Sequence, residues 1–208
     1  MNPAAALLVV DIQNDFCPRG ALAVAEGDAI VPLVNRLARR FETVVLTQDW
    51  HPPDHVSFAA QHPGLAPFAQ VTLPYGPQTL WPAHCVMATP GAAFHPGLDI
   101  PHAGLILRKG LHREVDSYSA FLEADRKTVT GLSGYLATRG VGEVFLCGLA
   151  LDFCVAWSAE DAASHGFKAT VIMDACRAID TSGSLQAALA RLDRAGVRRI
   201  TSGALDGG

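Results

Sequence analysis

The chain has 208 residues, of which half are hydrophobic and only 17% are charged. This length and composition predict one globular domain, residues 1–208, with a sizeable core, and they exclude a disordered chain. The net charge of −4 at pH 7 gives no reason to expect a nucleic acid or an acidic membrane surface as a partner.

The predicted elements alternate between strands and helices along the chain. The expected strands are residues 6–10, 43–47, 104–107, 143–147, 169–173 and 197–201, and the expected helices are residues 28–41, 132–138, 152–165 and 184–195. The strands are apolar or β-branched runs, whereas the helices carry apolar residues three or four positions apart. This alternation predicts a three-layer α/β/α fold with a six-stranded, mainly parallel sheet.

The N-terminal segment and the cysteines indicate the cellular compartment of the protein. The first ten residues are apolar, lack a basic start and run directly into Asp11, so we expect a buried strand rather than a signal peptide. No apolar segment approaches the roughly 18 residues that span a membrane. The cysteines, which are odd in number and lack CxxC spacing, are Cys17, Cys85, Cys147, Cys154 and Cys176. These features predict a reduced, cytoplasmic protein.

Residues 50–102 break the alternation, because they are rich in Pro, His and Gly and show little periodicity. A loop of that length in a compact domain is usually functional. Asp49 and His51 stand at its start, and side chains two apart in an extended segment point the same way. They could begin a metal site, which needs at least one more protein ligand. The histidines that the loop offers are His55, His62, His84, His95 and His102, and spacing alone does not choose among them.

Chemically useful side chains follow four of the predicted strands. Asp11 comes after the first strand, Asp49 and His51 after the second, Lys109 after the third and Cys154 after the fourth. Ligands of open parallel α/β sheets bind outside the carboxyl ends of the strands. We therefore expect a carboxylate, an Asp-x-His pair, a lysine and a thiol to converge on one edge of the sheet.

Cys154 is the candidate nucleophile of this group. It lies in the first turn of the predicted helix 152–165, for which Asp152 is the expected N-cap and Gly166 the expected stop. Unpaired N–H groups at a helix start carry partial positive charge, so we expect them to lower the pKa of the thiol. The plainer interpretation is a small buried apolar residue.

The neighbours of Cys154 favour the reactive interpretation. Asp11 would accept the proton of the thiol, and the charge of Lys109 would stabilise the thiolate and later negative charge. Each of these two residues also has an ordinary interpretation, as a solvated turn carboxylate and a surface lysine. Their joint occurrence at the strand ends is what favours chemistry.

The chain resembles the isochorismatase-like cysteine hydrolases, essentially from end to end and in order. The blocks that carry the resemblance are VVDIQNDF at 9–16, TQDWHP at 47–52, LWPAHCV at 80–86, RKG at 108–110 and DFCV at 152–155. The Asp-Trp-His-Pro and Trp-Pro-x-His-Cys-Val blocks are the specific ones, and they resemble the members that act on pyridine carboxamides. No catalytic position departs from the family pattern.

The resemblance implies a role for each matching residue. By it the catalytic triad is Asp11, Lys109 and Cys154, the metal ligands are Asp49, His51 and His84, and the substrate-binding residues are Phe16, Trp81, Leu149 and Tyr118. The Leu149–Ala150 bond matches a cis peptide, and the N–H groups of Ala150 and Cys154 would form the oxyanion hole. Tyr118 is the weaker match, because packing of its loop would explain it equally well.

The implied reaction is the hydrolysis of nicotinamide to nicotinate and ammonia through a thioester on Cys154, as a step of NAD salvage, with pyrazinamide as a further substrate. One divalent metal, zinc first and iron or manganese as alternatives, would bind the pyridine nitrogen and orient the ring. The expected partner is the small-molecule substrate, and a homo-oligomer is left open.

Other functions compete with this one. A related amidase could act on another small carboxamide or an N-carbamoyl compound, but it would not be expected to need the cluster of Asp49, His51 and His84. An ether hydrolase of the family would leave the thiol without a role. A domain kept only for interactions should have lost a site residue, and a redox sensor would favour a resolving thiol near Cys154, whereas Cys147 lies in a predicted buried strand.

Overall fold

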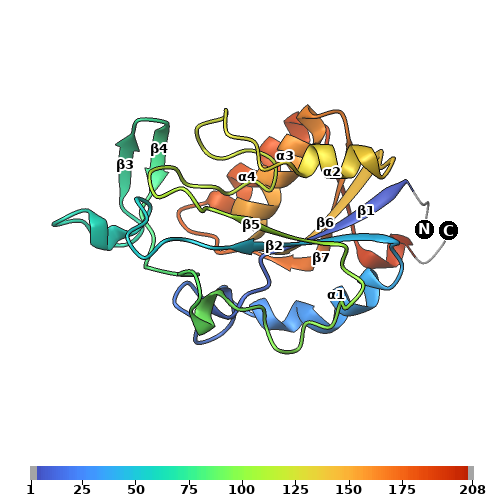
Figure 1. Ribbon diagram of the computed structural model, residues 1–208, viewed down its shortest axis with the longest axis horizontal. Coiled ribbons are helices and arrows are strands. Elements are labelled where there is room, and N and C mark those ends of the chain that lie inside the picture. Colours follow the sequence, from blue (N-terminus) through green and yellow to red (C-terminus); the bar gives the residue numbers. More distant parts are fainter. Residues whose placement is uncertain (1–3, 206–208) are drawn as a thin grey trace.

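The computed structural model describes residues 4–205 (Figure 1), so the ends of the expected domain, residues 1–3 and 206–208, lie outside the described part. The strands are β1 (Ala5–Val10), β2 (Thr43–Asp49), β3 (Gln70–Leu73), β4 (Gly76–Thr79), β5 (Leu105–Lys109), β6 (Glu143–Leu149), β7 (Lys168–Arg177) and β8 (Arg198–Ile200). The helices are α1 (Val31–Ala38), α2 (Leu132–Thr138), α3 (Ala156–Ser164) and α4 (Ser184–Arg194), and a π-helical turn, Leu151–Val155, leads into α3.

In the described chain, six parallel strands form one sheet in the order β5-β2-β1-β6-β7-β8. Figure 1 shows α2, α3 and α4 on one face of this sheet and α1 on the other. The predicted three-layer α/β/α fold is thereby confirmed. None of the helices between residues 4 and 205 combines the length and the apolar character of a membrane-crossing segment.

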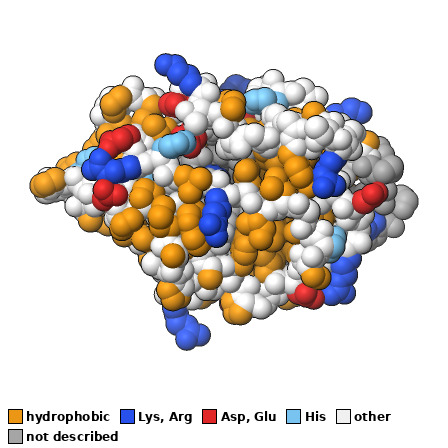
Figure 2. All heavy atoms as spheres, in the orientation of Figure 1, with side chains coloured by type: hydrophobic (Ala, Val, Ile, Leu, Met, Phe, Trp, Pro, Cys, Tyr) orange, Lys and Arg blue, Asp and Glu red, His pale blue; other side chains and the backbone are white. Residues whose placement is uncertain are grey.

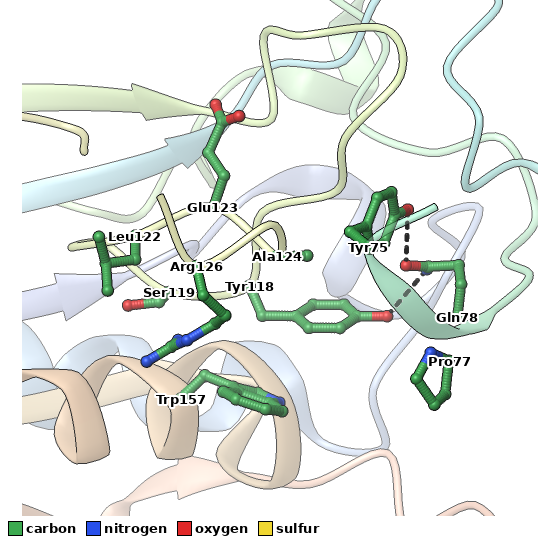
Figure 3. Close-up of a pocket in the computed structure, with 10 residues that line it drawn as sticks. All are labelled: Tyr75, Pro77, Gln78, Tyr118, Ser119, Leu122, Glu123, Ala124, Arg126 and Trp157. Carbon is green, nitrogen blue, oxygen red and sulfur yellow. Dashed lines mark hydrogen bonds between the residues drawn. The ribbon is translucent and has the colours of Figure 1, made fainter. Parts of the chain in front are cut away.

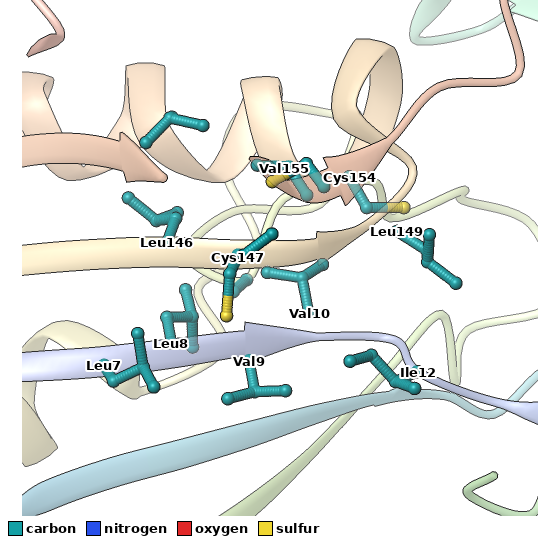
Figure 4. Close-up of a cluster of buried hydrophobic side chains, with 14 of the residues drawn as sticks. Leu7, Leu8, Val9, Val10, Ile12, Leu146, Cys147, Leu149, Cys154 and Val155 are labelled. Atoms are coloured by element: carbon teal, nitrogen blue, oxygen red, sulfur yellow. The ribbon is translucent and has the colours of Figure 1, made fainter. Parts of the chain in front are cut away.

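The core is centred on β1 and β6, which lie side by side. Every residue of β1 is buried, as are all but the first of β6. Figure 4 shows their apolar side chains together with Cys154 and Val155 from the π-helical turn. Burial of each Leu or Val side chain contributes about 1.5–3 kcal/mol. The turn that carries Cys154 is therefore anchored in the best-packed part of the molecule.

The helix predicted at 28–41 is shorter than expected. Residues Gly27–Ile30 form a 3-10 turn, and the α-helix begins only at Val31, with Pro32 in its first turn. Proline lacks an N–H and restricts the residue before it, so it fits the start of a helix and not its interior. Apolar spacing continued across this boundary and did not reveal it.

Asp152 does not cap a helix, contrary to the prediction. Its carboxylate is buried and accepts hydrogen bonds from the N–H groups of Ile179 and Asp180, at 3.0 and 2.9 Å, and from the hydroxyl of Ser184. The residue therefore joins the π-helical turn to the segment that enters α4. The predicted stop at Gly166 fits, since this residue adopts a φ of +87° after α3.

The predicted strands differ from the observed ones mainly at their ends. β5, β6 and β7 continue to Lys109, Leu149 and Arg177, beyond the apolar runs that predicted them. The region 50–102 is not a plain loop, because it contains the antiparallel hairpin of β3 and β4. Both strands of this hairpin have only four residues, and Pro77 lies within β4, so the alternation of β3 is too short, and β4 too irregular, to mark a strand in the sequence.

Candidate active site

The side chains predicted at the strand ends meet around one ammonium group. Lys109 is the last residue of the edge strand β5, yet it is only 2% exposed. Its Nζ lies 2.8 Å from Oδ2 of Asp11 and 3.5 Å from Sγ of Cys154, and it also contacts Oδ1 of Asp49. The carbonyl oxygen of Ser117 accepts a further hydrogen bond from it at 3.0 Å. One cation thus joins two carboxylates and the thiol.

Charge pairing holds Lys109 in its ionised form. Burial by itself would lower the pKa of Lys109, but the carboxylates of Asp11 and Asp49 raise it well above its usual range. The same cation acts on Asp49. Burial alone would raise the pKa of Asp49, but the charges of Lys109 and His51 lower it far below its usual range. A buried ion pair of this kind is stable only as a complete set.

Asp11 is the candidate general base. It directly follows β1 and adopts a φ of +47°, a left-handed conformation that Asp tolerates better than most residues. Thr47 donates a hydrogen bond from its hydroxyl to Oδ1 at 2.5 Å. Burial raises the pKa of Asp11 to about 6, although Lys109 opposes the shift. The carboxylate is therefore a stronger base than an ordinary aspartate and is ionised at neutral pH.

The prediction of a lowered pKa for Cys154 is wrong. The residue lies in the π-helical turn, and burial raises the pKa of its thiol well above the usual range despite the nearby charge of Lys109. A hydrogen bond to Asp11 acts in the same direction as burial. One ligand atom from each of Asp11, Asp49 and Cys154 lies within 4.8 Å of the others. The resting site thus holds a neutral thiol beside a base.

Three predicted ligands also come together beside Lys109. Nε2 of His51 lies 3.7 Å from Oδ2 of Asp49, and Nε2 of His84 lies 4.0 Å from the same oxygen. All three side chains are buried, and their ligand atoms lie within 4.8 Å of one another. Burial lowers the pKa of His84 to about 4, so its imidazole is neutral, which is the form that binds a metal.

The backbone orients both imidazoles toward Asp49. Nδ1 of His51 lies 3.0 Å from the carbonyl oxygen of Gly110, and Nδ1 of His84 lies 2.8 Å from that of Pro82. Each carbonyl oxygen accepts a hydrogen bond from Nδ1–H and so leaves the lone pair of Nε2 for a metal. Metal-binding histidines are commonly held in this way. One carboxylate and two such imidazoles fit a divalent ion.

The remaining histidines of the loop make other contacts. His55 is buried against His51, but its ring nitrogens lie 2.8 Å from Oγ of Ser57 and 3.2 Å from the carbonyl oxygen of Val115. His51, His55 and Asp116 form another group with suitable atoms, yet those contacts engage the ring of His55. Contacts to backbone groups away from the cluster are made by His62, His95 and His102.

An aromatic cavity opens beside the thiol and the three ligands. Its walls are Phe16, Leu22, Asp49, His51, Trp81, His84, Asp116, Tyr118, Ala150, Phe153, Cys154 and Ile179. The ring of Trp81 meets that of Phe153 edge-on, with centroids 4.9 Å apart. Phe16 lies 5.5 Å from the ring of His84. The cavity has a volume of only about 20 Å³, so its aromatic walls would have to move apart to admit a flat ring next to the nucleophile.

The Leu149–Ala150 peptide is cis, as the resemblance implied. Ala150 lines the cavity together with Cys154. Leu149 itself is fully buried in the core and is not among the residues that line the cavity. We therefore no longer expect its side chain to contact a ligand.

Sequence reasoning missed several residues around the site. Thr47 could have been found, because it stands two positions before Asp49 in β2 and its side chain must point to the same face of the sheet. Phe153 could have been found as well, because it precedes Cys154 in the block DFCV. The contact of the Ser117 carbonyl with Lys109 and the place of Ile179 in the cavity wall depend on loop conformation, and no sequence pattern marks them.

This fold, with its thiol, lysine and carboxylates at the strand ends, is that of a cysteine hydrolase. Residues 5–204 match the family described as Isochorismatase domain, and the chain belongs to that family. The predicted family membership is confirmed.

Within the family, the nicotinamidase of Acinetobacter baylyi is 57% identical over 197 residues, which cover 95% of this chain and 92% of the relative. A solved nicotinamidase–pyrazinamidase of Acinetobacter baumannii superposes with a TM-score of 0.98 at 56% identity, over 99% of each chain. The zinc complex of the pyrazinamidase of Pyrococcus horikoshii superposes with a TM-score of 0.78 at 35% identity, over 96% of this chain and 99% of that one.

Proposed function

We propose that this enzyme hydrolyses nicotinamide to nicotinate and ammonia, with Cys154 as the nucleophile. The observation that carries the proposal is the position of the Lys109 ammonium, which lies 2.8 Å from the candidate base Asp11 and 3.5 Å from the thiol. The high identity to nicotinamidases supports the choice of substrate. A domain kept only for interactions has no use for such a buried, charged assembly.

The chemistry follows from the protonation states of Cys154, a neutral thiol, and Asp11, an ionised carboxylate. Asp11 accepts the proton of the thiol as Sγ of Cys154 forms a bond to the carboxamide carbon, and the carbonyl oxygen takes the negative charge. The N–H groups of Ala150 and Cys154 stabilise that oxyanion. Asp11 then gives the proton to the departing ammonia, which leaves a thioester. Water, deprotonated by Asp11, attacks the thioester and releases nicotinate and the thiol.

Lys109 has an electrostatic role in this scheme. Its charge, balanced at rest by Asp11 and Asp49, stabilises the thiolate when the proton has moved to Asp11. Because the site is buried, this interaction is stronger than it would be in water. Thr47 keeps the carboxylate of Asp11 oriented toward the thiol through its hydrogen bond.

We infer that Asp49, His51 and His84 hold one divalent metal ion, with zinc as the first choice. The tautomers of the two histidines and the neutral state of His84 support this set, as does the zinc complex of the Pyrococcus horikoshii relative. When bound, the ion would offer an open coordination position to the nitrogen of a pyridine ring. Phe16, Trp81 and Tyr118 would hold the faces and edge of that ring.

Several wider expectations belong to the same proposal. Pyrazinamide carries a ring nitrogen and a carboxamide in the same relation, so it should also be a substrate. The release of nicotinate suits a role in NAD salvage.

We also infer that the chain forms one catalytic domain, since the family match extends over 5–204. The cytoplasmic location is still a prediction.

An ammonia-release assay tests the proposed substrate. Wild-type enzyme loaded with zinc should release ammonia from nicotinamide and from pyrazinamide. Benzamide is the matched control, since it keeps the carboxamide and lacks the ring nitrogen, and its kcat/KM should be at least about 100-fold lower. Absence of ammonia release from nicotinamide by the metal-loaded enzyme would refute the assignment.

A further inference from the structure

Gln78 lies outside the aromatic cavity, yet it is joined to the cavity wall. It stands on β4 of the hairpin and is 1% exposed. Its Nε2 lies 2.7 Å from Oδ2 of Asp116, 2.7 Å from the carbonyl oxygen of Thr79 and 3.0 Å from the hydroxyl oxygen of Tyr118, so its two hydrogens are shared among three acceptors. Tyr75 donates its hydroxyl to Oε1 at 3.0 Å, which fixes the orientation of the amide (Figure 3).

The hydroxyl of Tyr118 passes this restraint on to Trp81. The indole Nε1–H of Trp81 donates to the same hydroxyl oxygen at 3.0 Å. A tyrosine oxygen can accept two hydrogen bonds, and here Trp81 and Gln78 supply them. Trp81 is a buried wall of the aromatic cavity. Its indole is therefore held at one end by a hydroxyl that Gln78 positions.

Packing alone does not hold Tyr118 in place. Its ring lines the aromatic cavity and also borders a second cavity of about 300 Å³, which Tyr75 and Trp157 help to line. Figure 3 shows the Tyr118 ring extended across this second cavity, with its hydroxyl toward Gln78. The rings of Phe153 and Trp157 pack against the Tyr118 ring, with centroids 5.6 and 6.4 Å away, and the part that faces the cavity lacks such dispersion contacts. The hydrogen bonds at its hydroxyl thus add to packing in holding the ring.

We propose that Gln78 is a positioning residue for the substrate ring, because it fixes Tyr118 and, through Tyr118, the indole of Trp81. The proposal rests on the proposed function only for the identity of the ring. Gln78 contacts the walls of the aromatic cavity, Tyr118 and Asp116, and is not among the residues that line it beside Cys154. Its loss should therefore affect KM more than kcat.

The test replaces Gln78 by methionine, which has a similar length and no hydrogen-bonding amide. Gln78→Met should raise KM for nicotinamide roughly 10-fold and lower kcat by less than about 3-fold, as the loss of hydrogen bonds to a binding wall predicts. Gln70→Met is the matched control, since Gln70 lies exposed on the same hairpin and bonds to Thr79. The control should leave both constants unchanged.

A second readout follows Trp81 without substrate. In a ¹H–¹⁵N spectrum the indole signal of Trp81, assigned with Trp81→Phe, should shift in Gln78→Met, whereas that of Trp50 should not. This measurement tests the proposal even if nicotinamide is not a substrate. An unshifted Trp81 signal overturns the proposal, and so does an unchanged KM in an enzyme that is active on nicotinamide.

A double-mutant cycle shows whether Gln78 acts through Tyr118. If it does, Gln78→Met should raise KM clearly less in Tyr118→Phe than in the wild type, because the hydroxyl that it positions is already gone and only its other hydrogen bonds, such as that to Asp116, are left to lose. Additive effects on KM would overturn the proposal. Should Gln78→Met fail to fold, Tyr75→Phe removes only the hydroxyl that orients the amide and should raise KM roughly 3-fold; an unchanged KM in that variant overturns the proposal too.

Discussion

The Lys109 ammonium and the Asp11 carboxylate lie 2.8 Å apart in a fully buried setting. Neither charge could stay there alone, since Lys109 depends on both Asp11 and Asp49, whereas Asp11 depends on Lys109 and is opposed by the like charge of Asp49. The pair thus serves two purposes. It compensates the buried charges, and it places a base and a cation beside the thiol of Cys154.

Lys109→Met should abolish most activity and lower stability. The variant leaves Asp11 and Asp49 buried without a cation, so unfolding free energy should fall by about 3–5 kcal/mol, and kcat should fall by about 100-fold or more. Urea unfolding and ammonia release measure the two effects. The matched control is Lys168→Met, at an exposed position of β7. Near wild-type stability in Lys109→Met would contradict the account of the buried cluster.

Activity should fall on the acid side of neutrality. Burial raises the pKa of Asp11 to about 6, and protonation removes its ability to accept the proton of the thiol. The pH profile of kcat/KM should therefore decline as the pH drops through about 6. Thr47 lowers this pKa through its hydrogen bond, so Thr47→Val should move the decline to higher pH. A shift to lower pH in this variant would exclude Asp11 as the titrating base.

Gly110→Ala should weaken metal binding although it replaces no ligand. Gly110 adopts a φ of +68°, and an added Cβ would lie 2.3 Å from the ring of His51. The ring must move, so zinc affinity, measured by competition with a chromogenic chelator, should fall at least about 10-fold. Gly134→Ala is the control, because an added Cβ there meets no atom within 4 Å. Equal affinities in the two variants would show that His51 is not a ligand.

Asp152→Ala should loosen the wall that contains Ile179. The variant removes the acceptor for two backbone N–H groups and the Ser184 hydroxyl, so unfolding free energy should fall by about 2–4 kcal/mol. KM should rise as well, because Ile179 lines the aromatic cavity. Asp152→Asn keeps one acceptor oxygen and should lose less stability. The account fails if Asp152→Ala is as stable as the wild type.

The sheet and the convergence at its edge could be predicted from the sequence because both depend on local patterns. Apolar runs give β1 and β6, and the carboxyl ends of parallel strands share one edge, which is why Asp11, Lys109 and Cys154 meet. The pKa of Cys154 could not be predicted in this way. A helix start favours a thiolate, but burial depth, which only the packed structure reveals, outweighs it.

Loop contacts account for the other misses. The strands of the β3–β4 hairpin are only four residues long, and the partners of Asp152 are 27 to 32 residues away in the chain. Such contacts arise from the path of a loop and not from periodicity. The same reason hid Gln78, whose place beside Tyr118 depends on a hairpin strand and a separate loop that meet in space.

The most direct test of the central claim compares ammonia release from nicotinamide by Cys154→Ala and by the wild type, both loaded with zinc. If Cys154 is the nucleophile, kcat of the variant should be lower by about 1,000-fold or more, while circular dichroism shows an intact fold. A variant that retains more than about a tenth of wild-type kcat would contradict the thioester mechanism.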